Sequence, residues 1–331
     1  MPKNGGQRPA APSSSAPNMA VTIGSISLPN PVMTAAGTVG YGDELSHHMQ
    51  LGDLGAVVTK SLAHFAWNGN PAPRVTGTDA GMLNAVGLQG PGVASWLSED
   101  LPRLLKRTPR VIASIWGRSV DDFERAAALM AAAPPQVLAV EVNLSCPNLE
   151  GRSGMFAHSV ELSAAAIDAA KVCGRPVWAK LSPNTHDLIA VASAVSDAGA
   201  EAVTLINTVL GMAIDPDTLR PVLGNGGGGL SGSPIRPIAV RAIFDVREAL
   251  PDLPIVGVGG ISRPEHAIEM FAAGASAIQV GTALFRDPRA ATKVARDLAQ
   301  WCRNRGVQSV FEMTNAAHQR PVAQQLPKDS Q

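Results

Sequence analysis

The chain of 331 residues repeats one pattern eight times: a short, almost wholly apolar run, a polar or glycine-rich loop, and a stretch in which apolar residues recur with helical spacing. Short apolar runs between helical segments are typical of buried strands in a parallel sheet. The predicted strands are residues 31–36, 56–61, 111–116, 138–145, 176–182, 202–208, 254–261 and 277–284. Eight such units predict an α/β fold, namely a single (β/α)8 TIM barrel.

Two of the intervening segments carry specific helix signals. Apolar positions 188, 191, 192 and 195 fall on one helical stripe, which we expect to face the strands. Ser262 and Glu265 have the spacing of a capping box around an early proline, and Gly274 follows where the apolar rhythm stops. They predict a helix that opens at Ser262 and ends at Gly274.

The segments outside the repeats define the domain limits. Residues 21–28 alternate apolar and polar side chains, which predicts a short N-terminal β-hairpin that plugs the bottom of the barrel. Residues 1–18 are rich in Pro, Ser, Ala and Gly and are expected to form a disordered arm. The barrel domain is therefore placed at 19–310, followed by a partly disordered tail at 311–331.

Composition and charge exclude several classes of function. The 27 basic and 27 acidic residues cancel, so no long-range field favours nucleic acid, and no window approaches the ~20 apolar residues of a membrane span. Cys146, Cys173 and Cys302 are too few and too widely spaced for a disulfide framework or an iron–sulfur site, which fits a reducing cytoplasm. His47 and His48 lack zinc-site spacing, so we expect exposed side chains there and no bound metal.

In a barrel of this type the active site lies at the carboxyl ends of the strands. Gly259 and Gly260 follow the seventh predicted strand, and Gly281 and Thr282 lie in the eighth. Glycine lets backbone N–H groups approach a phosphate closely, so these loops predict a phosphate site, with plain tight turns as the alternative. A G-x-G-x-x-G fingerprint is absent, which argues against a Rossmann nicotinamide site.

Two lysines stand at the ends of apolar strands. Lys60 and Lys180 would be costly to bury alone, so each is expected to face the barrel mouth and an anionic ligand. The alternative is a structural ion pair, with Glu141 as the candidate partner of one of them.

Amides and one cysteine complete the candidate chemistry. Asn84, Asn143, Asn148 and Asn207 lie in strand-end or loop contexts and together match a planar ligand with C=O and N–H groups, although any one of them could be a turn residue. Cys146 lies on a polar loop after the fourth strand, where its thiolate could act as a base or nucleophile, whereas the other two cysteines read as buried apolar residues. No histidine is close in sequence, which favours a base.

A series of collinear segments between about residues 20 and 290 resembles the class 1 dihydroorotate dehydrogenases, most of all the NAD-linked class 1B catalytic subunit. The segments are NPVMTAAGT (30–38), VVTKS (57–61), GNPAPRV (69–75), MLNAVGLQGPG (82–92), NLSCPN (143–148), AKLSPN (179–184), LINTVLGMAID (205–215), GGLSG (228–232), VGGI (258–261) and QVGTALFRDP (279–288).

The resemblance implies an FMN-dependent barrel that oxidises (S)-dihydroorotate to orotate in pyrimidine (UMP) biosynthesis. Cys146 would remove the C5 proton while hydride passes from C6 to flavin N5. The implied substrate contacts are Lys60, Asn84, Ala85, Val86, Gly87, Leu88, Asn143, Asn148, Asn207 and Thr208. The implied FMN contacts are Ala36, Lys60, Ser61, Ser114, Asn143, Lys180, Ile206, Gly232, Gly259, Gly260, Gly281 and Thr282, with Lys180 beside the flavin N1–O2 edge.

This chain departs from the family pattern at two positions and leaves the electron acceptor open. Ala36 and Ser114 stand where the family commonly has Ser and Asn. Reduction of NAD would need a partner subunit with FAD and a 2Fe-2S cluster, whereas reduction of fumarate would not. The expected assembly is a homodimer or a heterotetramer. The alternatives are an FMN barrel that acts on another pyrimidine, like dihydropyrimidine dehydrogenase, and a non-catalytic scaffold.

Overall fold

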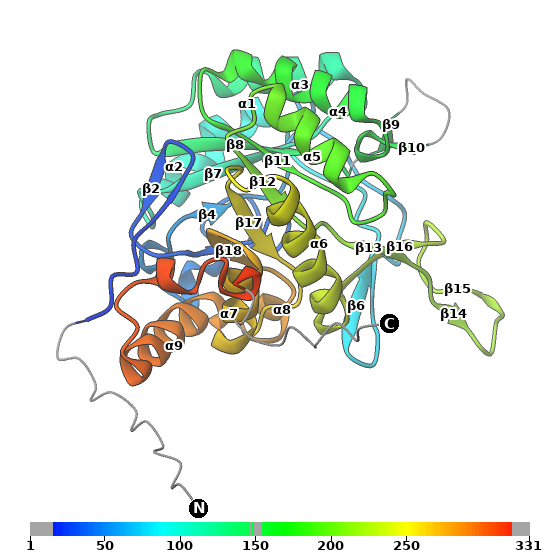
Figure 1. The fold of residues 1–331 in the computed structure, drawn as a ribbon. Helices are drawn as coiled ribbons and strands as arrows, with labels where there is room; N and C mark the ends of the chain where they lie inside the picture. Colours follow the sequence, from blue (N-terminus) through cyan, green and yellow to red (C-terminus); the bar gives the residue numbers. More distant parts are fainter. Residues whose placement is uncertain (1–15, 146, 149–153, 320–331) are drawn as a thin grey trace, which may run out of the picture.

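The computed structural model describes residues 16–145, 147–148 and 154–319 (Figure 1). Eight strands form one parallel sheet in the order β3-β18-β17-β12-β11-β8-β7-β4. A bridge between Met33 and Ala56 joins its two edges and closes the barrel. The strands are β3 (Val32–Thr34), β4 (Val57–Val58), β7 (Val111–Ile115), β8 (Val137–Asn143), β11 (Val177–Lys180), β12 (Ala202–Leu205), β17 (Ile255–Val258) and β18 (Ala277–Val280). The predicted barrel and its eight strands are confirmed.

Helices surround the barrel and cover the outer faces of the strands (Figure 1). The main ones are α3 (Val120–Met130), α4 (Val160–Ala170), α5 (Leu188–Asp197), α6 (Arg236–Ala249), α7 (Pro264–Ala273) and α9 (Ala290–Arg305). Shorter segments are α1 (Val93–Ser95), a π-helical turn (Trp96–Asp100), α2 (Leu101–Leu105), α8 (Ala283–Arg286), and 3₁₀ turns at 44–47, 51–53, 156–158, 171–173, 233–235, 310–313 and 316–318. No helix in the described part of the chain is both long and apolar enough to cross a membrane.

The two helix signals had different outcomes. On α5, Val191, Ala192 and Val195 are buried against the barrel, as predicted. Helix α7 ends at Gly274, where φ is +122°, which is also as predicted. The capping box was wrong: α7 begins at Pro264, so Ser262 lies one residue too early to cap it, and its hydroxyl lies 3.4 Å from His266 Nδ1 instead.

A hairpin of β1 (Val21–Ile23) and β2 (Ile26–Leu28) plugs the amino-terminal end of the barrel. Ile23, Ile26 and Leu28 are buried in the cluster of side chains that fills the barrel interior, together with Trp178. At the turn, the Ser25 hydroxyl and backbone N–H both donate to Glu201 Oε2, at 2.6 and 2.8 Å. The predicted hairpin and its position are confirmed.

A second sheet lies at the other end of the barrel, on the right of Figure 1. Its four antiparallel strands run in the order β13 (Val209–Gly211), β16 (Gly228–Gly232), β6 (Gly81–Asn84) and β5 (Val75–Gly77). Between β13 and β16 the chain projects outward as an arm with β14 (Ile214–Asp215) and β15 (Arg220–Pro221), and β9 (Pro147–Asn148) pairs with β10 (Gly154–Met155). These strands were not predicted, because short glycine-rich segments lack the apolar runs that mark buried strands.

Near the bottom of the barrel, the segment that precedes the hairpin lies against the segment that follows α9. The backbone N–H of Asn18 donates to Gln308 O at 2.7 Å. Ser309 and Glu312 form a capping box at the 3₁₀ turn that follows. The parts of both predicted disordered ends beyond residues 16 and 319 lie outside the described residues, so the domain limits remain proposals.

The hairpin plug yields a test of stability. Ile23 is fully buried, so Ile23→Ala leaves a cavity at the barrel bottom and should lower the free energy of unfolding by about 2–5 kcal/mol. Its neighbour Thr22 points to solvent on the opposite face of the same strand, and Thr22→Ala should change stability by less than ~0.5 kcal/mol. Urea denaturation measures both values, and equal effects of the two substitutions would contradict a buried plug.

Candidate active site

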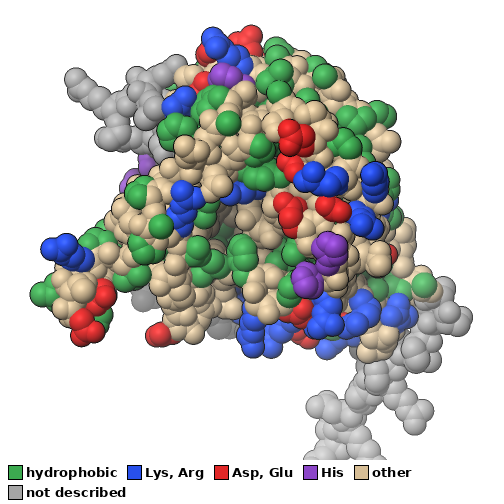
Figure 2. All heavy atoms as spheres, turned by 180° about the vertical axis from the view of Figure 1, so that it is seen from behind, with side chains coloured by type: hydrophobic (Ala, Val, Ile, Leu, Met, Phe, Trp, Pro, Cys, Tyr) green, Lys and Arg blue, Asp and Glu red, His purple; other side chains and the backbone are tan. Residues whose placement is uncertain are grey.

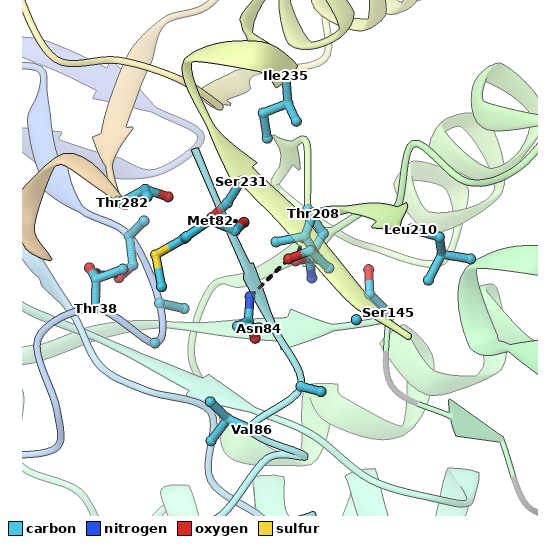
Figure 3. A pocket seen from close by; sticks show the side chains of 18 of the residues that line it. Thr38, Met82, Asn84, Val86, Ser145, Thr208, Leu210, Ser231, Ile235 and Thr282 are labelled. Atoms are coloured by element: carbon cyan, nitrogen blue, oxygen red, sulfur yellow. Dashed lines mark hydrogen bonds between the residues drawn. The ribbon is translucent and has the colours of Figure 1, made fainter. Parts of the chain in front are cut away.

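A cavity of about 1040 Å³ opens at the carboxyl ends of the barrel strands, beneath the small antiparallel sheet. In Figure 3, Thr38 and Thr282 lie toward one side of this cavity, Leu210 and Ser145 toward the other, and Asn84 lies between them on β6. The predicted site residues that line the cavity are Ala36, Lys60, Ser61, Asn84, Ala85, Val86, Gly87, Leu88, Asn143, Lys180, Ile206, Asn207, Thr208, Gly232, Gly259, Gly260, Gly281 and Thr282. The structure therefore brings most of the predicted residues into one space.

The other three predicted residues are Ser114, Cys146 and Asn148. Ser114 is fully buried behind the wall, with its Oγ 2.8 Å from Ser61 Oγ. Cys146 lies outside the described residues. Asn148 belongs to β9, but the structure does not describe its side chain.

Glycines form one end of the cavity. Gly232 and Gly260 have φ values of +96° and +70°, which side-chain-bearing residues rarely adopt. A Cβ on Gly260 would lie 2.8 Å from Arg236 Cβ and 2.9 Å from Gly232 O. Only glycine fits here, so backbone rather than side chains forms this end, as close approach to a phosphate requires.

Lys180 satisfies both interpretations that the sequence left open. Its side chain lines the cavity, and its Nζ lies 3.8 Å from Oε1 of Glu141. Glu141 is fully buried, so this contact is shielded from water. Lys180 is thus both paired and presented to the cavity.

Lys60 enters the cavity from the end of β4. Burial lowers the pKa of its ammonium group, and the nearby positive charge of Arg74 lowers it further. Arg74 is held in place by its Nε, which donates to Asn70 O at 2.6 Å. Lys60 at the wall, with the charge of Arg74 nearby, makes this part of the cavity suited to an anion such as a carboxylate.

A chain of hydrogen-bonded polar side chains connects the carboxyl ends of β12, β8 and β4, which are not adjacent in the barrel. Asn207 Nδ2 donates to Asn143 Oδ1 at 3.1 Å, and Asn143 Nδ2 donates to Ser61 Oγ at 3.3 Å. Across the cavity, Asn84 Nδ2 donates to Gly229 O at 3.3 Å, the bond drawn dashed in Figure 3. These bonds fix the orientation of the amides at the mouth of the barrel before any ligand binds.

The loop at 84–88 is held in one unusual conformation. Gly87 and Leu88 have φ values of +73° and +61°, and Trp67 Nε1 donates to Gly87 O at 3.0 Å. A positive φ at Leu88 is strained for a residue with a side chain, and such strain is common at binding sites.

Sequence reasoning missed several cavity residues. They include Asn70, Val75, Met82, Ser145, His158, Asn184, Leu210, Asn225, Ser231, Ile235 and Phe285. Asn184 was inside the motif AKLSPN but received no role: its Nδ2 donates to Thr208 O and its Oδ1 accepts from Leu210 N, both at 2.9 Å. Most of the others lie on the small sheet or in loops, where no periodic pattern points to a cavity.

Other predictions concern residues away from the cavity. His47 and His48 are exposed, and Cys173 and Cys302 are buried free thiols, as expected. Among the described residues, no three His, Cys, Asp or Glu side chains are grouped so that they could hold a metal ion.

The fold and the cavity define the class first: a (β/α)8 barrel enzyme with a glycine-lined end and an amide-rich mouth that carries two lysines. A family model described as dihydroorotate dehydrogenase matches residues 18–301. The chain therefore belongs to the dihydroorotate dehydrogenase family.

Similar curated proteins agree with this family. The chain is 45% identical to the dihydroorotate dehydrogenase B (NAD(+)) catalytic subunit of Desulforudis audaxviator, over 90% of this chain and 97% of that protein. It is 42% and 41% identical to proteins of the same name from Trichlorobacter lovleyi and Geobacter sulfurreducens, each over 91% of this chain and 98% of the relative. The predicted class 1B dihydroorotate dehydrogenase, an oxidoreductase of pyrimidine biosynthesis, is confirmed.

The setting of Lys60 predicts how its reactivity depends on pH. Because its pKa is lowered, Lys60 loses its proton at a lower pH than an unperturbed lysine would. It should therefore react at a lower pH with a reagent that modifies amines. Arg74→Met removes a positive neighbour and should shift the onset of labelling to higher pH, whereas Arg74→Lys should leave it near the wild-type position. Competitive labelling followed by mass spectrometry measures the onset. An equal shift in both variants would show that the charge of Arg74 is not the cause.

Proposed function

We propose that this chain oxidises dihydroorotate to orotate with FMN bound in the cavity. The observation that carries the proposal is the gathering of a glycine-lined end, two lysines and several oriented amides in one cavity. These are the groups needed for a phosphate, an electron-accepting planar ring and an anionic ring substrate.

The cavity residues fit FMN. Gly232, Gly259, Gly260, Gly281 and Thr282 surround the end where only backbone approaches, which suits the phosphate. Lys180 would lie beside the N1–O2 edge of the flavin, with Ala36, Lys60, Ser61, Asn143 and Ile206 around the ring. Bound FMN would supply the hydride acceptor. Ser114 would act from behind the wall, through the hydroxyl of Ser61.

The remaining polar residues fit dihydroorotate. Lys60 would pair with its carboxylate, together with the backbone of residues 84–88. Asn84, Asn143, Asn148, Asn207 and Thr208 would match the alternating donors and acceptors of its ring. The bond between Asn207 and Asn143 supports this role, because it presents the two amides as one fixed surface.

Cys146 is the proposed base that removes the C5 proton. Two observations support this role. Cys146 stands in the motif NLSCPN, and the residue before it, Ser145, lines the cavity. As a thiolate, Cys146 would accept the C5 proton on its Sγ, while hydride leaves the neighbouring carbon, C6.

A second subunit is the proposed route for electrons to NAD. The relatives are named as NAD(+) catalytic subunits, which supports a partner subunit. The proposed partner carries FAD and a 2Fe-2S cluster, as the resemblance to class 1B implies. The arm between β13 and β16, which projects from the molecule at the left of Figure 2, exposes Met212, Ile214 and Leu219, apolar area that a subunit contact would bury. Free thiols at Cys173 and Cys302 fit the proposed cytoplasmic location.

Isolation from the native host tests the partner. A stoichiometric subunit with FAD and iron–sulfur supports NAD as acceptor, in a heterotetramer. A homodimer without such a subunit that is active with fumarate would contradict it.

The flavin itself gives the direct test of the activity. Purified protein should be yellow, and anaerobic dihydroorotate should bleach the flavin absorbance because hydride moves from C6 to the ring. Absorption spectroscopy measures both results, with 5,6-dihydrouracil as the control because it has the same reducible ring but lacks the carboxylate. Protein that stays colourless after FMN is added, or that is bleached only by another dihydropyrimidine, would overturn the proposal.

The role of the base has its own test. Cys146→Ala should retain FMN but slow flavin reduction by dihydroorotate by about 10²–10⁴-fold, since a general base typically contributes that much. Anaerobic stopped-flow absorbance measures the rate. Cys302→Ala is the matched control, because Cys302 is buried in α9, outside the cavity. Reduction at the wild-type rate in Cys146→Ala would remove this residue from the mechanism.

A further inference from the structure

Beneath the cavity, four polar side chains from four barrel strands form one buried network. Glu141 lies on β8, Lys180 on β11, Thr204 on β12 and Gln279 on β18. Glu141, Thr204 and Gln279 are fully buried, and Lys180 is 5% exposed. Barrel interiors are usually filled by branched apolar side chains, so a polar layer here needs an explanation.

The two carboxylate oxygens of Glu141 have different surroundings. Oε2 accepts hydrogen bonds from Thr204 Oγ1 at 2.9 Å and from Gln279 Nε2 at 2.7 Å. Oε1 is buried without a hydrogen bond among the described residues, and Lys180 Nζ lies 3.8 Å away. The neutral donors therefore hold one oxygen in place, and the other is directed at the ammonium group.

This geometry differs from that of a purely structural ion pair. A charge-assisted hydrogen bond between ammonium and carboxylate is about 2.7–2.9 Å long, and a buried carboxylate normally needs such contacts on both oxygens. Here Lys180 Nζ lies 3.8 Å from Glu141 Oε1, beyond hydrogen-bond distance, and the Lys180 side chain also lines the cavity. The ammonium group is thus available to a second partner in the cavity.

We propose that Glu141 is a positioning residue that acts through Lys180 and sets how strongly the site stabilises negative charge on a bound flavin. The inference rests on the proposed function, in which the N1–O2 edge of FMN is the second partner of Lys180. Thr204 and Gln279 fix the carboxylate, and the carboxylate holds the ammonium back and offsets part of its positive charge.

Sulfite is the probe for this charge. Its sulfur donates an electron pair to flavin N5 to form an S–N bond, and negative charge moves to the N1–O2 edge, so no oxidant or reductant is needed. The dissociation constant of sulfite, measured by loss of flavin absorbance in the FMN-loaded enzyme, therefore reports the positive potential at that edge.

Glu141→Gln keeps the shape of the side chain and an oxygen that can accept from Thr204 and Gln279, but it removes the negative charge. Lys180 is then no longer offset, so sulfite should bind about tenfold more tightly, which corresponds to about 1.4 kcal/mol. The flavin reduction potential should rise accordingly. Unchanged sulfite affinity in a folded, FMN-loaded Glu141→Gln variant would overturn the proposal, even if its thermal stability falls.

A double-mutant cycle separates action through Lys180 from a direct effect of the Glu141 charge. Lys180→Met should weaken sulfite binding, and adding Glu141→Gln to it should then have little effect. If Glu141→Gln tightens sulfite binding equally with and without Lys180, the carboxylate does not act through the lysine and the proposal fails.

If Glu141→Gln does not fold, Thr204→Val can be used to test the same role of the Glu141 charge. Without the Thr204 hydroxyl, Glu141 Oε2 keeps one donor, so more of its charge acts on Lys180, and sulfite binding should weaken about two- to fivefold. Thr34→Val is the matched control, because Thr34 is an equally buried barrel threonine whose hydroxyl bonds only to the backbone of Val58. Equal sulfite affinities in the two variants would contradict the inference.

The failures of the two proposals can be distinguished. Wild-type protein that binds no FMN would overturn the proposed function, and this inference with it. Wild-type protein that binds FMN and is bleached by dihydroorotate, with variants that bind sulfite as the wild type does, would overturn only the role of Glu141.

Discussion

The parallel pairing of the eight barrel strands is the constraint on which the site depends. Because every strand runs in the same direction around the closed sheet, all carboxyl ends meet at one opening. Residues as distant in sequence as Lys60 and Thr282 therefore line one cavity. The other opening is filled by the β1–β2 hairpin, whose Ile23 and Leu28 join the barrel interior. The cavity therefore forms at the opening that the hairpin leaves free.

Placing polar groups at the top of an apolar barrel costs desolvation energy, and the structure offsets this cost with hydrogen bonds between strands. Asn207, Asn143, Ser61 and Ser114 form a continuous chain across four strand ends. One layer below, Thr204 and Gln279 satisfy one oxygen of Glu141. In the first arrangement neutral donors orient the amides at the mouth, and in the second they orient the Glu141 carboxylate toward Lys180. The site is therefore ordered before any ligand binds.

The sequence predicted the barrel well because its strands are buried on both faces, and burial leaves apolar runs that can be read directly. The mouth was predicted less completely. Strand β16 is largely glycine, and a Cβ on Gly228 or Gly229 would lie 2.4 Å from Asn84 O or 2.1 Å from Thr208 Oγ1. These glycines are required by close approach in space, which linear periodicity does not reveal. The wrong capping box at Ser262 has a similar cause. The motif predicted that the Ser262 hydroxyl would cap the helix, but in the structure this hydroxyl lies beside His266 Nδ1.

The same reasoning accounts for the two departures from the family pattern. A serine at 114 is too short to reach the cavity from β7, and its hydroxyl bonds to that of Ser61 instead. Ser61 Oγ also accepts from Asn143 Nδ2, so the Ser61 hydroxyl links the side chains of Ser114 and Asn143 at the cavity wall. At Ala36 no side-chain donor is present, and the adjacent wall is formed by backbone and by Thr38, whose hydroxyl donates to Ala35 O at 2.8 Å. Of these two hydroxyl residues, Ser61 thus lines the cavity and Ser114 lies behind it.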